Sequence, residues 1–319
     1  MLAPDSHVKP VESDAGLVKN PARNPICRMA HRFKDTCGLW LFPAVRRAER
    51  RLPVQGLYRI LKPYALVRAG LRGIPASVPL PACLGAAKAV PAVRHWRVSA
   101  YLNQILEYFP ERLAEPKWTE CCRIAGLDHL RQAQQSRRPV VLAFCHFGPF
   151  FLLRTWLRAA GFPIAALVGG KRASRSRLRR QEDRVSLFAE IPTAFHMDQL
   201  RAAYEFLDAG HALMVAIDTV TSRRLSVPAG GGWTFHMATG ALRLAIRHGA
   251  ELIPFSIVDG GRWRFQIELG RPVPAEYLVS EDNLVPAGKH LLDELLPHFR
   301  NHPENCSNQL IHRFQPPVP

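Results

Sequence analysis

The residue whose type and position point most directly to chemistry is His146. It follows the apolar run 139–145, which predicts a short buried strand, and it precedes a Gly148-Pro149 turn. In open α/β sheets, ligands bind beyond the carboxyl ends of the strands. A histidine there is suited to act as a general base, while the alternative is a purely structural strand-end histidine.

Cys145 stands directly before His146 and raises the alternative of a Cys–His nucleophile pair. Successive residues of a strand point to opposite faces of the sheet. We therefore expect Cys145 to pack in the core while His146 faces a crevice.

An imidazole that acts as a base needs an acceptor for its other N–H group, so that the correct nitrogen faces the substrate. Asp218 ends the predicted strand 212–217 just as His146 ends its own strand. Asp218 is thus the predicted partner of His146, with a loop-capping role as its alternative. Asp259 and Glu182 are weaker candidates for the same role.

Basic and glycine-rich segments supply candidates for substrate binding. The stretch 171–184 holds seven basic residues and predicts a phosphate-binding lip, because the planar guanidinium group makes paired hydrogen bonds to phosphate. A solvated helix face would give the same pattern. The predicted substrate-binding residues are Phe147, Gly148, Lys171, Arg172, Arg175, Arg223, Arg224 and Gly231.

The elements that must position these residues alternate between strand and helix patterns after residue 96. Such alternation predicts an α/β fold, a mixed sheet with helices on both faces. A hairpin is expected over Asp259-Gly260-Gly261, and a glycine-rich loop is expected between the strand 212–217 and the helix 237–248. The other predicted strands are 139–145, 164–168, 193–197 and 212–217, and the predicted helices are 98–109, 150–160, 175–188, 198–208 (with Asp198 as N-cap) and 237–248.

The first third of the chain has a different character. Residues 1–35 are polar and aperiodic and are interpreted as a flexible tail. Residues 36–95 place apolar side chains at helical spacing, among them Leu57, Ile60 and Leu61, with basic residues between them. This pattern predicts an amphipathic, membrane-associating region, and an ordinary surface helix is its alternative. Residues 96–319 are then the main domain.

Composition limits the class of protein. The 319 residues are 47% hydrophobic, with 43 Lys and Arg against 26 Asp and Glu, a formal net charge of +17. Such a charge suits anionic lipid headgroups, an acidic carrier protein or nucleic acid. Seven cysteines without a CxxC pair predict neither a zinc site nor a disulfide framework. We expect no secretory signal and no transmembrane helix, because the uncharged run 73–87 is short and contains three prolines.

Four ordered blocks between about residues 98 and 275 together resemble the lysophospholipid acyltransferase superfamily, in particular its lipid A late acyltransferase branch. The first block is Phe109-Pro110-Glu111 and the second is Gly126-Leu127-Asp128-His129-Leu130. The third is the strand that ends in His146-Phe147-Gly148. The fourth runs from Leu207-Asp208-Ala209-Gly210 through Asp218-Thr219 and Val227-Pro228-Ala229-Gly230 to Thr239-Gly240-Ala241 and Ile253-Pro254.

The resemblance implies a glycerolipid acyltransferase-like fold and transfer of a fatty acyl group from an acyl carrier protein or coenzyme A thioester to a lipid or glycolipid acceptor. It implies no bound cofactor, since the thioester is a co-substrate, and a peripheral position on the cytoplasmic face of the inner membrane. His146 would be the base and Asp218 its partner.

One departure from the family pattern matters. The family has an acidic residue five positions after the histidine, where this chain has Phe151. A non-catalytic homologue that binds lipid or a partner protein is therefore the alternative function. Nucleic-acid binding is not expected, because the basic residues lack interleaved aromatics and no known nucleic-acid-binding motif is present.

Overall fold

The computed structural model describes residues 43–70, 80–85, 92–106, 109, 112–168, 194–219 and 224–317. The described residues from Val45 onward belong to one compact unit. The flexible tail predicted for residues 1–35 lies outside the described residues, and the predicted boundary at residue 95 stays a prediction.

This unit is built on a seven-stranded mixed sheet with the order β1-β9-β8-β2-β5-β3-β4. Five adjacent strands, from β8 to β4, run parallel, whereas β9 is antiparallel to β8 and β1 is parallel to β9. The strands are β1 (Cys122–Ala125), β2 (Val140–Phe144), β3 (Ile164–Val168), β4 (Ala194–His196), β5 (Ala212–Ala216), β8 (Glu251–Asp259) and β9 (Phe265–Leu269). The predicted α/β class, mixed sheet and hairpin over Asp259 are confirmed.

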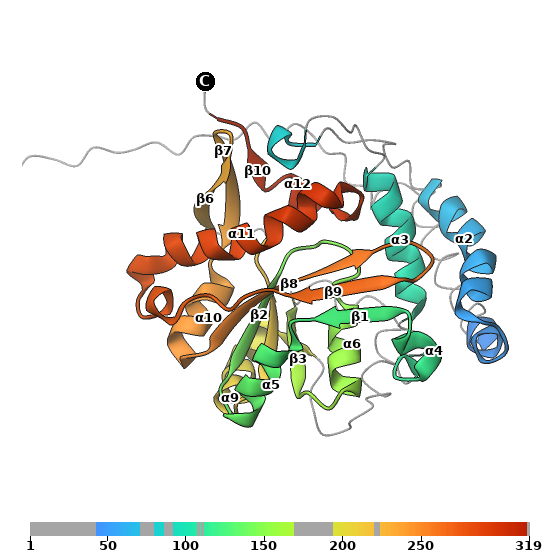
Figure 1. Ribbon diagram of the computed structural model, residues 1–319, viewed down its shortest axis with the longest axis horizontal. Coiled ribbons are helices and arrows are strands. Elements are labelled where there is room, and N and C mark those ends of the chain that lie inside the picture. The colour runs from blue at the N-terminus through green and yellow to red at the C-terminus, as the bar shows by residue number, and fades with distance from the viewer. Residues whose placement is uncertain are drawn as a thin grey trace, which may run out of the picture. The chain divides into compact units, whose positions relative to one another are not determined.

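Helices cover both faces of this sheet (Figure 1). One face carries Val141, Ala143 and Val215, which share a core cluster with apolar residues of α9, α10 and α11. The opposite face carries Phe144, Phe255 and Phe265, and the ring of Trp156 from α6 lies 5.3 Å from that of Phe265. Because β2 is apolar at all five positions, it can be buried on both faces, as it is here.

The principal helices are α2 (Val54–Gly70), α3 (Ala92–Leu106), α5 (Leu127–Gln135), α6 (Leu152–Ala159), α9 (Leu200–Asp208), α10 (Gly240–His248) and α11 (Leu284–Asn301). Short helical segments are α4 (Pro116–Thr119), α12 (Asn308–Ile311), η2 (Ala82–Leu84), η4 (Met197–Gln199), η5 (Ala275–Leu278), η6 (Glu281–Asn283) and η7 (Pro303–Asn305). The N-cap of α9 is Gln199, so the predicted capping role of Asp198 is wrong. The helix predicted over 175–188 lies outside the described residues.

A second, three-stranded sheet occupies the region that the glycine pattern predicted as a loop. It consists of β6 (Arg224–Gly230), β7 (Trp233–Ala238) and the short β10 (Phe314–Gln315), all antiparallel. Gly230, Gly231 and Gly232 all have positive φ and form the tight turn of the β6–β7 hairpin. The glycines thus mark a turn between two strands, and the loop interpretation is corrected.

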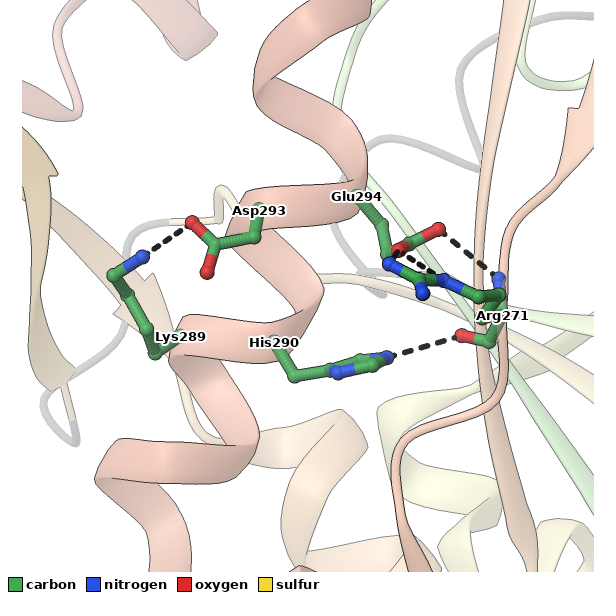
Figure 2. A network of polar contacts seen from close by, with 5 residues as sticks. All are labelled: Arg271, Lys289, His290, Asp293 and Glu294. Atoms are coloured by element: carbon green, nitrogen blue, oxygen red, sulfur yellow. Dashed lines mark hydrogen bonds and ion pairs between the residues drawn. The ribbon is translucent and has the colours of Figure 1, made fainter.

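Helix α11 lies against β6 and β8 (Figure 1) and is also bonded to the irregular segment that follows β9. The guanidinium group of Arg271 donates to Glu294 at 2.7 and 2.9 Å, and its backbone N–H donates to the same carboxylate at 3.1 Å. Figure 2 shows this pair beside His290, while Lys289 and Asp293 form an ion pair on the other side of the helix. The contacts with Arg271 attach α11 to the segment that follows β9, whereas the Lys289–Asp293 pair lies within the helix.

A buried carboxylate attaches the first described helical residues to the segment around α4. Residues 43–51 are helical, and Glu49 within them is fully buried. Its carboxylate pairs with Lys117 at 2.6 Å and with Arg112, and it accepts from Trp118 Nε1 at 3.0 Å. Among the described residues, no helix is long and apolar enough to span a membrane.

Glu49→Gln tests this attachment. Burial alone would raise the pKa of Glu49, but hydrogen bonds from Lys117 and Trp118 and the nearby positive charges hold that pKa below its ordinary value. Its stabilising contribution is therefore complete at neutral pH and is lost as pH falls through the lowered pKa. We expect Glu49→Gln to lower the free energy of unfolding by about 3 kcal/mol at pH 7. In denaturant titrations the difference from wild type should shrink as the pH falls below the ordinary pKa range of a glutamate carboxyl, and a pH-independent difference would contradict this account.

Candidate active site

The register between two central strands brings His146 and Asp218 together. β2 and β5 are parallel neighbours in which Phe144 is paired with Ala216. Each candidate residue follows its strand by two positions, so both lie at the same carboxyl edge of the sheet. The backbone N–H of Ile217 donates to the carbonyl oxygen of Phe144 at 2.8 Å and extends the pairing toward them.

The two side chains make a close contact. His146 Nδ1 lies 2.7 Å from Asp218 Oδ1, and the backbone N–H of His146 donates to Asp218 Oδ2 at 2.9 Å. The carboxylate is fully buried, whereas 26% of the imidazole surface is exposed. Both carboxylate oxygens therefore accept from a single residue.

This geometry determines what the imidazole can do. With an ionised carboxylate at 2.7 Å, the proton on Nδ1 is donated to Asp218, so Nε2 of the neutral ring keeps its lone pair. Among the described residues, none forms a hydrogen bond with Nε2. The pair thus has the arrangement of a general base whose tautomer is held by a carboxylate.

The turn after His146 depends on a glycine. Gly148 has φ of +52°, and a Cβ atom there would lie 1.8 Å from the carbonyl oxygen of Ile257. The Gly148 N–H donates to the carbonyl oxygen of Asn305 at 2.9 Å. Close approach of two backbones therefore sets the direction in which the chain leaves His146.

Aromatic rings border the imidazole on one side. The Phe150 ring stands edge-on to it with a centroid distance of 4.8 Å, and Phe150 in turn stacks on Phe144. Phe151 contacts Phe150 edge-on and is half-buried at the start of α6. Position 151, where the acyltransferase family that the sequence resembles has an acidic residue, thus carries an aromatic ring. The carboxylate beside His146 comes instead from Asp218, after β5.

Cys145 lies on the opposite face of the sheet, as the alternation of the strand predicts. Its side chain is buried in the core cluster with Ile217 and Cys306. Burial, together with the negative charge of Asp218, raises the pKa of the Cys145 thiol well above its ordinary value. A neutral, buried thiol is a poor nucleophile, so the Cys–His alternative is not supported.

A second histidine–aspartate pair gives an internal comparison. His248 Nδ1 lies 2.6 Å from Asp208 Oδ1, which is as close as the contact at the candidate site. Its imidazole, however, is only 5% exposed, and its Nε2 is buried. The His146 pair has the reverse arrangement, with a buried acid and an accessible imidazole, and this arrangement leaves the basic nitrogen open to a substrate.

The other predicted acid partners are not available to His146. Asp259 accepts hydrogen bonds from Ser99, from Asn103 at 3.3 Å and from the Gly261 N–H at 2.8 Å. It therefore attaches α3 to the end of β8. Glu182 lies outside the described residues.

Residues 305–313, named here the C-terminal strap, contribute contacts that the sequence pattern did not reveal. Cys306 forms a bridge with Phe147, and the Ser307 N–H donates to the carbonyl oxygen of His146 at 3.1 Å. Gln309 Nε2 donates to the carbonyl oxygen of Asp218 at 3.1 Å and lies 3.2 Å from His146 Nδ1. The strap thus touches both members of the pair.

The structure places the predicted substrate-binding residues in different environments. Phe147 is buried with its ring 5.1 Å from that of Phe299, so its predicted contact with substrate is corrected to core packing. Gly231 lies in the exposed hairpin turn, at the opposite end of the hairpin from Ala238.

Arg224 is exposed and pairs with Ala238, whose N–H donates to the carbonyl oxygen of Ile217 at 2.7 Å. It therefore begins β6 at the end of the hairpin that adjoins Asp218. The remaining predicted residues lie outside the described residues: Lys171, Arg172, Arg175 and Arg223.

Within the described ranges, no group of three or more His, Cys, Asp or Glu side chains is arranged to hold a metal ion. No model of a protein family matches this chain, and no curated protein matches it at a significant level.

Thiol labelling tests whether the side chains of Cys145 and Cys306 are buried in the folded protein. Burial also raises the pKa of Cys306, so neither Cys145 nor Cys306 should be a thiolate near pH 8. We expect both to resist iodoacetamide in the folded protein and to react fully after unfolding, as measured by peptide mass spectrometry. Alkylation of Cys145 in the native state at the rate of a free thiol would contradict the buried position.

Proposed function

We propose that this protein is an acyltransferase that moves a fatty acyl group from a thioester to a lipid or glycolipid acceptor. The observation that carries the proposal is the pairing of a partly exposed His146 with the buried carboxylate of Asp218 at the carboxyl edge of the sheet. The resemblance of the sequence blocks to the lipid A late acyltransferase branch supplies the reaction class, together with the glycerolipid acyltransferase-like fold proposed here.

The proposed reaction is direct. The acceptor hydroxyl or amine attacks the thioester carbonyl while His146 Nε2 removes its proton, and the tetrahedral intermediate then expels a thiolate, which takes the proton back from Nε2. Asp218 stabilises the imidazolium that forms in between. General-base assistance of this kind is worth about 10²–10⁴-fold in rate.

No covalent enzyme intermediate is part of the proposal. The thiol nearest to His146 in sequence is buried on the other face of the sheet, and its raised pKa keeps it protonated. A two-substrate reaction with both substrates bound together follows. The donor is an acyl carrier protein or coenzyme A thioester.

A basic residue at the hairpin end that adjoins Asp218 suits an anionic substrate group. Arg224 lies at the end of the hairpin that adjoins Asp218, and Arg223 precedes it in the sequence. An arginine there can pair with a phosphate of the acceptor headgroup or of the donor. The basic stretch 171–184 is proposed for the same role on sequence grounds alone.

A peripheral position on a membrane surface is the second part of the proposal. Ile60 and Val67 on α2 are 61% and 62% exposed, and with Pro63 they fall on one stripe of the helix. Exposed Arg59 and Lys62 lie beside that stripe. Apolar side chains flanked by cations match the interface of an anionic bilayer, and the cytoplasmic face of the inner membrane is the location proposed.

The alternative of an inactive homologue rested on the missing acid at Phe151. The carboxylate of Asp218, 2.7 Å from Nδ1, can take the place of that acid and supports the active enzyme over the inactive homologue. Active transfer is therefore the function that the geometry supports best.

The central prediction concerns turnover. In assays of acyl-CoA and acyl carrier protein thioesters with a bacterial lipid extract, we expect His146→Ala to lower the rate by at least about 100-fold. Asp218→Asn should lower it by at least about tenfold, or roughly 1.4 kcal/mol of barrier. The control is Asp208→Asn, which alters the second histidine–aspartate pair and should retain the wild-type rate. Near-normal turnover by folded His146→Ala would end the proposal.

Membrane association is tested on the exposed stripe of α2. We expect Ile60→Asn with Val67→Asn to reduce binding to vesicles that contain anionic lipid. Binding of the wild type should also weaken with salt, since charges are screened over about 8 Å near physiological ionic strength. Val279→Asn with Val285→Asn changes two other exposed apolar residues and is the matched control. Equal losses in both double variants, or no loss in either, would argue against docking through α2.

A further inference from the structure

Gln309 approaches the His146–Asp218 pair from the C-terminal strap, at the side of Nδ1. Its amide nitrogen is 3.1 Å from the carbonyl oxygen of Asp218 and 3.2 Å from His146 Nδ1. We propose that Gln309 is a positioning residue that holds Asp218 in place and leaves its carboxylate as the acceptor for the Nδ1 proton. This inference rests on the proposed function.

The orientation of the amide follows from its partner. A backbone carbonyl oxygen can only accept, so the group of Gln309 that faces it must be the NH₂ group. The same NH₂ group therefore faces Nδ1. Because Nδ1 already donates its proton to Asp218 at 2.7 Å, the approach of Gln309 to Nδ1 is a packing contact between two donors.

This arrangement specifies a tautomer. A carboxylate or carbonyl at the place of the NH₂ group would offer Nδ1–H a second acceptor and let the ring turn away from Asp218. The NH₂ group of Gln309 is a donor and cannot accept the Nδ1 proton. Gln309 thus occupies the place that another acceptor for the Nδ1 proton would need. Its hydrogen bond to the Asp218 carbonyl oxygen also holds the backbone of the residue that carries the carboxylate.

The strap is well placed for this task because it is fixed on both sides of Gln309. On one side, Ser307 donates to the backbone of His146, and its hydroxyl caps α12 by accepting from the Leu310 N–H at 3.0 Å. On the other side, the Arg313 carbonyl accepts from the His236 N–H at 2.9 Å, immediately before β10 joins β7. Gln309 therefore reaches the pair from a backbone held at both ends.

The first test reads the proton itself and needs no turnover. In proton spectra of the full chain labelled with ¹⁵N-histidine, the Nδ1–H of His146 should give a low-field resonance that disappears in His146→Ala. Gln309→Met keeps the length of the side chain and removes its donor, so this resonance should move upfield and exchange faster with water. Gln132→Met, at an exposed position on α5, is the control and should leave the resonance unchanged.

The second test is the split between kcat and KM. We expect Gln309→Met to lower kcat about fivefold, the typical effect of one net hydrogen bond, with KM little changed. Gln309→Glu, which offers Nδ1–H a competing acceptor, should lower kcat further. Both variants should melt as cooperatively as the wild type.

An Nδ1–H resonance that is the same in wild type and Gln309→Met would overturn the inference, whatever the activity. Equal kcat values for the wild type and Gln309→Glu would overturn it as well. A perturbed resonance in a protein without acyl-transfer activity would instead support the positioning role and contradict the proposed function, so the two failures can be told apart.

Discussion

The site depends on a buried carboxylate whose two oxygens, among the described residues, both accept hydrogen bonds from His146. Asp218 is fully removed from solvent, and it accepts from the backbone and from the ring of His146. An ionised carboxylate without such partners would be costly to bury. The same two contacts that make its burial tolerable also hold the imidazole in one orientation, so stability and the proposed chemistry rest on one interaction.

Three separate parts of the chain maintain this interaction. The parallel register of β2 and β5 sets the spacing of the two residues, and the left-handed Gly148 turns the chain away directly afterwards. The C-terminal strap donates hydrogen bonds to the backbone carbonyl oxygens of both residues. Mutations far from the exposed imidazole, for example in the strap, are therefore expected to act through its geometry.

Part of this arrangement could be predicted from the sequence. The apolar runs before His146 and Asp218 predict strands, and strand alternation separates Cys145 from His146, as is observed. The β6–β7 hairpin could not be predicted, because Gly230-Gly231-Gly232 is typical of a loop as much as of a turn. Nor could the role of the strap, since its contacts with His146 and Asp218 are made largely through backbone atoms distant in sequence, and such contacts leave no residue pattern. Phe151 alone was uninformative. The absence of the family's acidic residue at that position does not indicate which other residue supplies the carboxylate.

Mass spectrometry of total lipids is the most direct test of acyl transfer through His146. Lipids would be compared from cells that express the wild-type chain, from cells that express His146→Ala at equal protein level, and from cells without the protein. The account predicts lipid species heavier by one fatty acyl group in the wild-type cells alone. Identical lipid profiles in all three, or the same acylated species with His146→Ala, would contradict it.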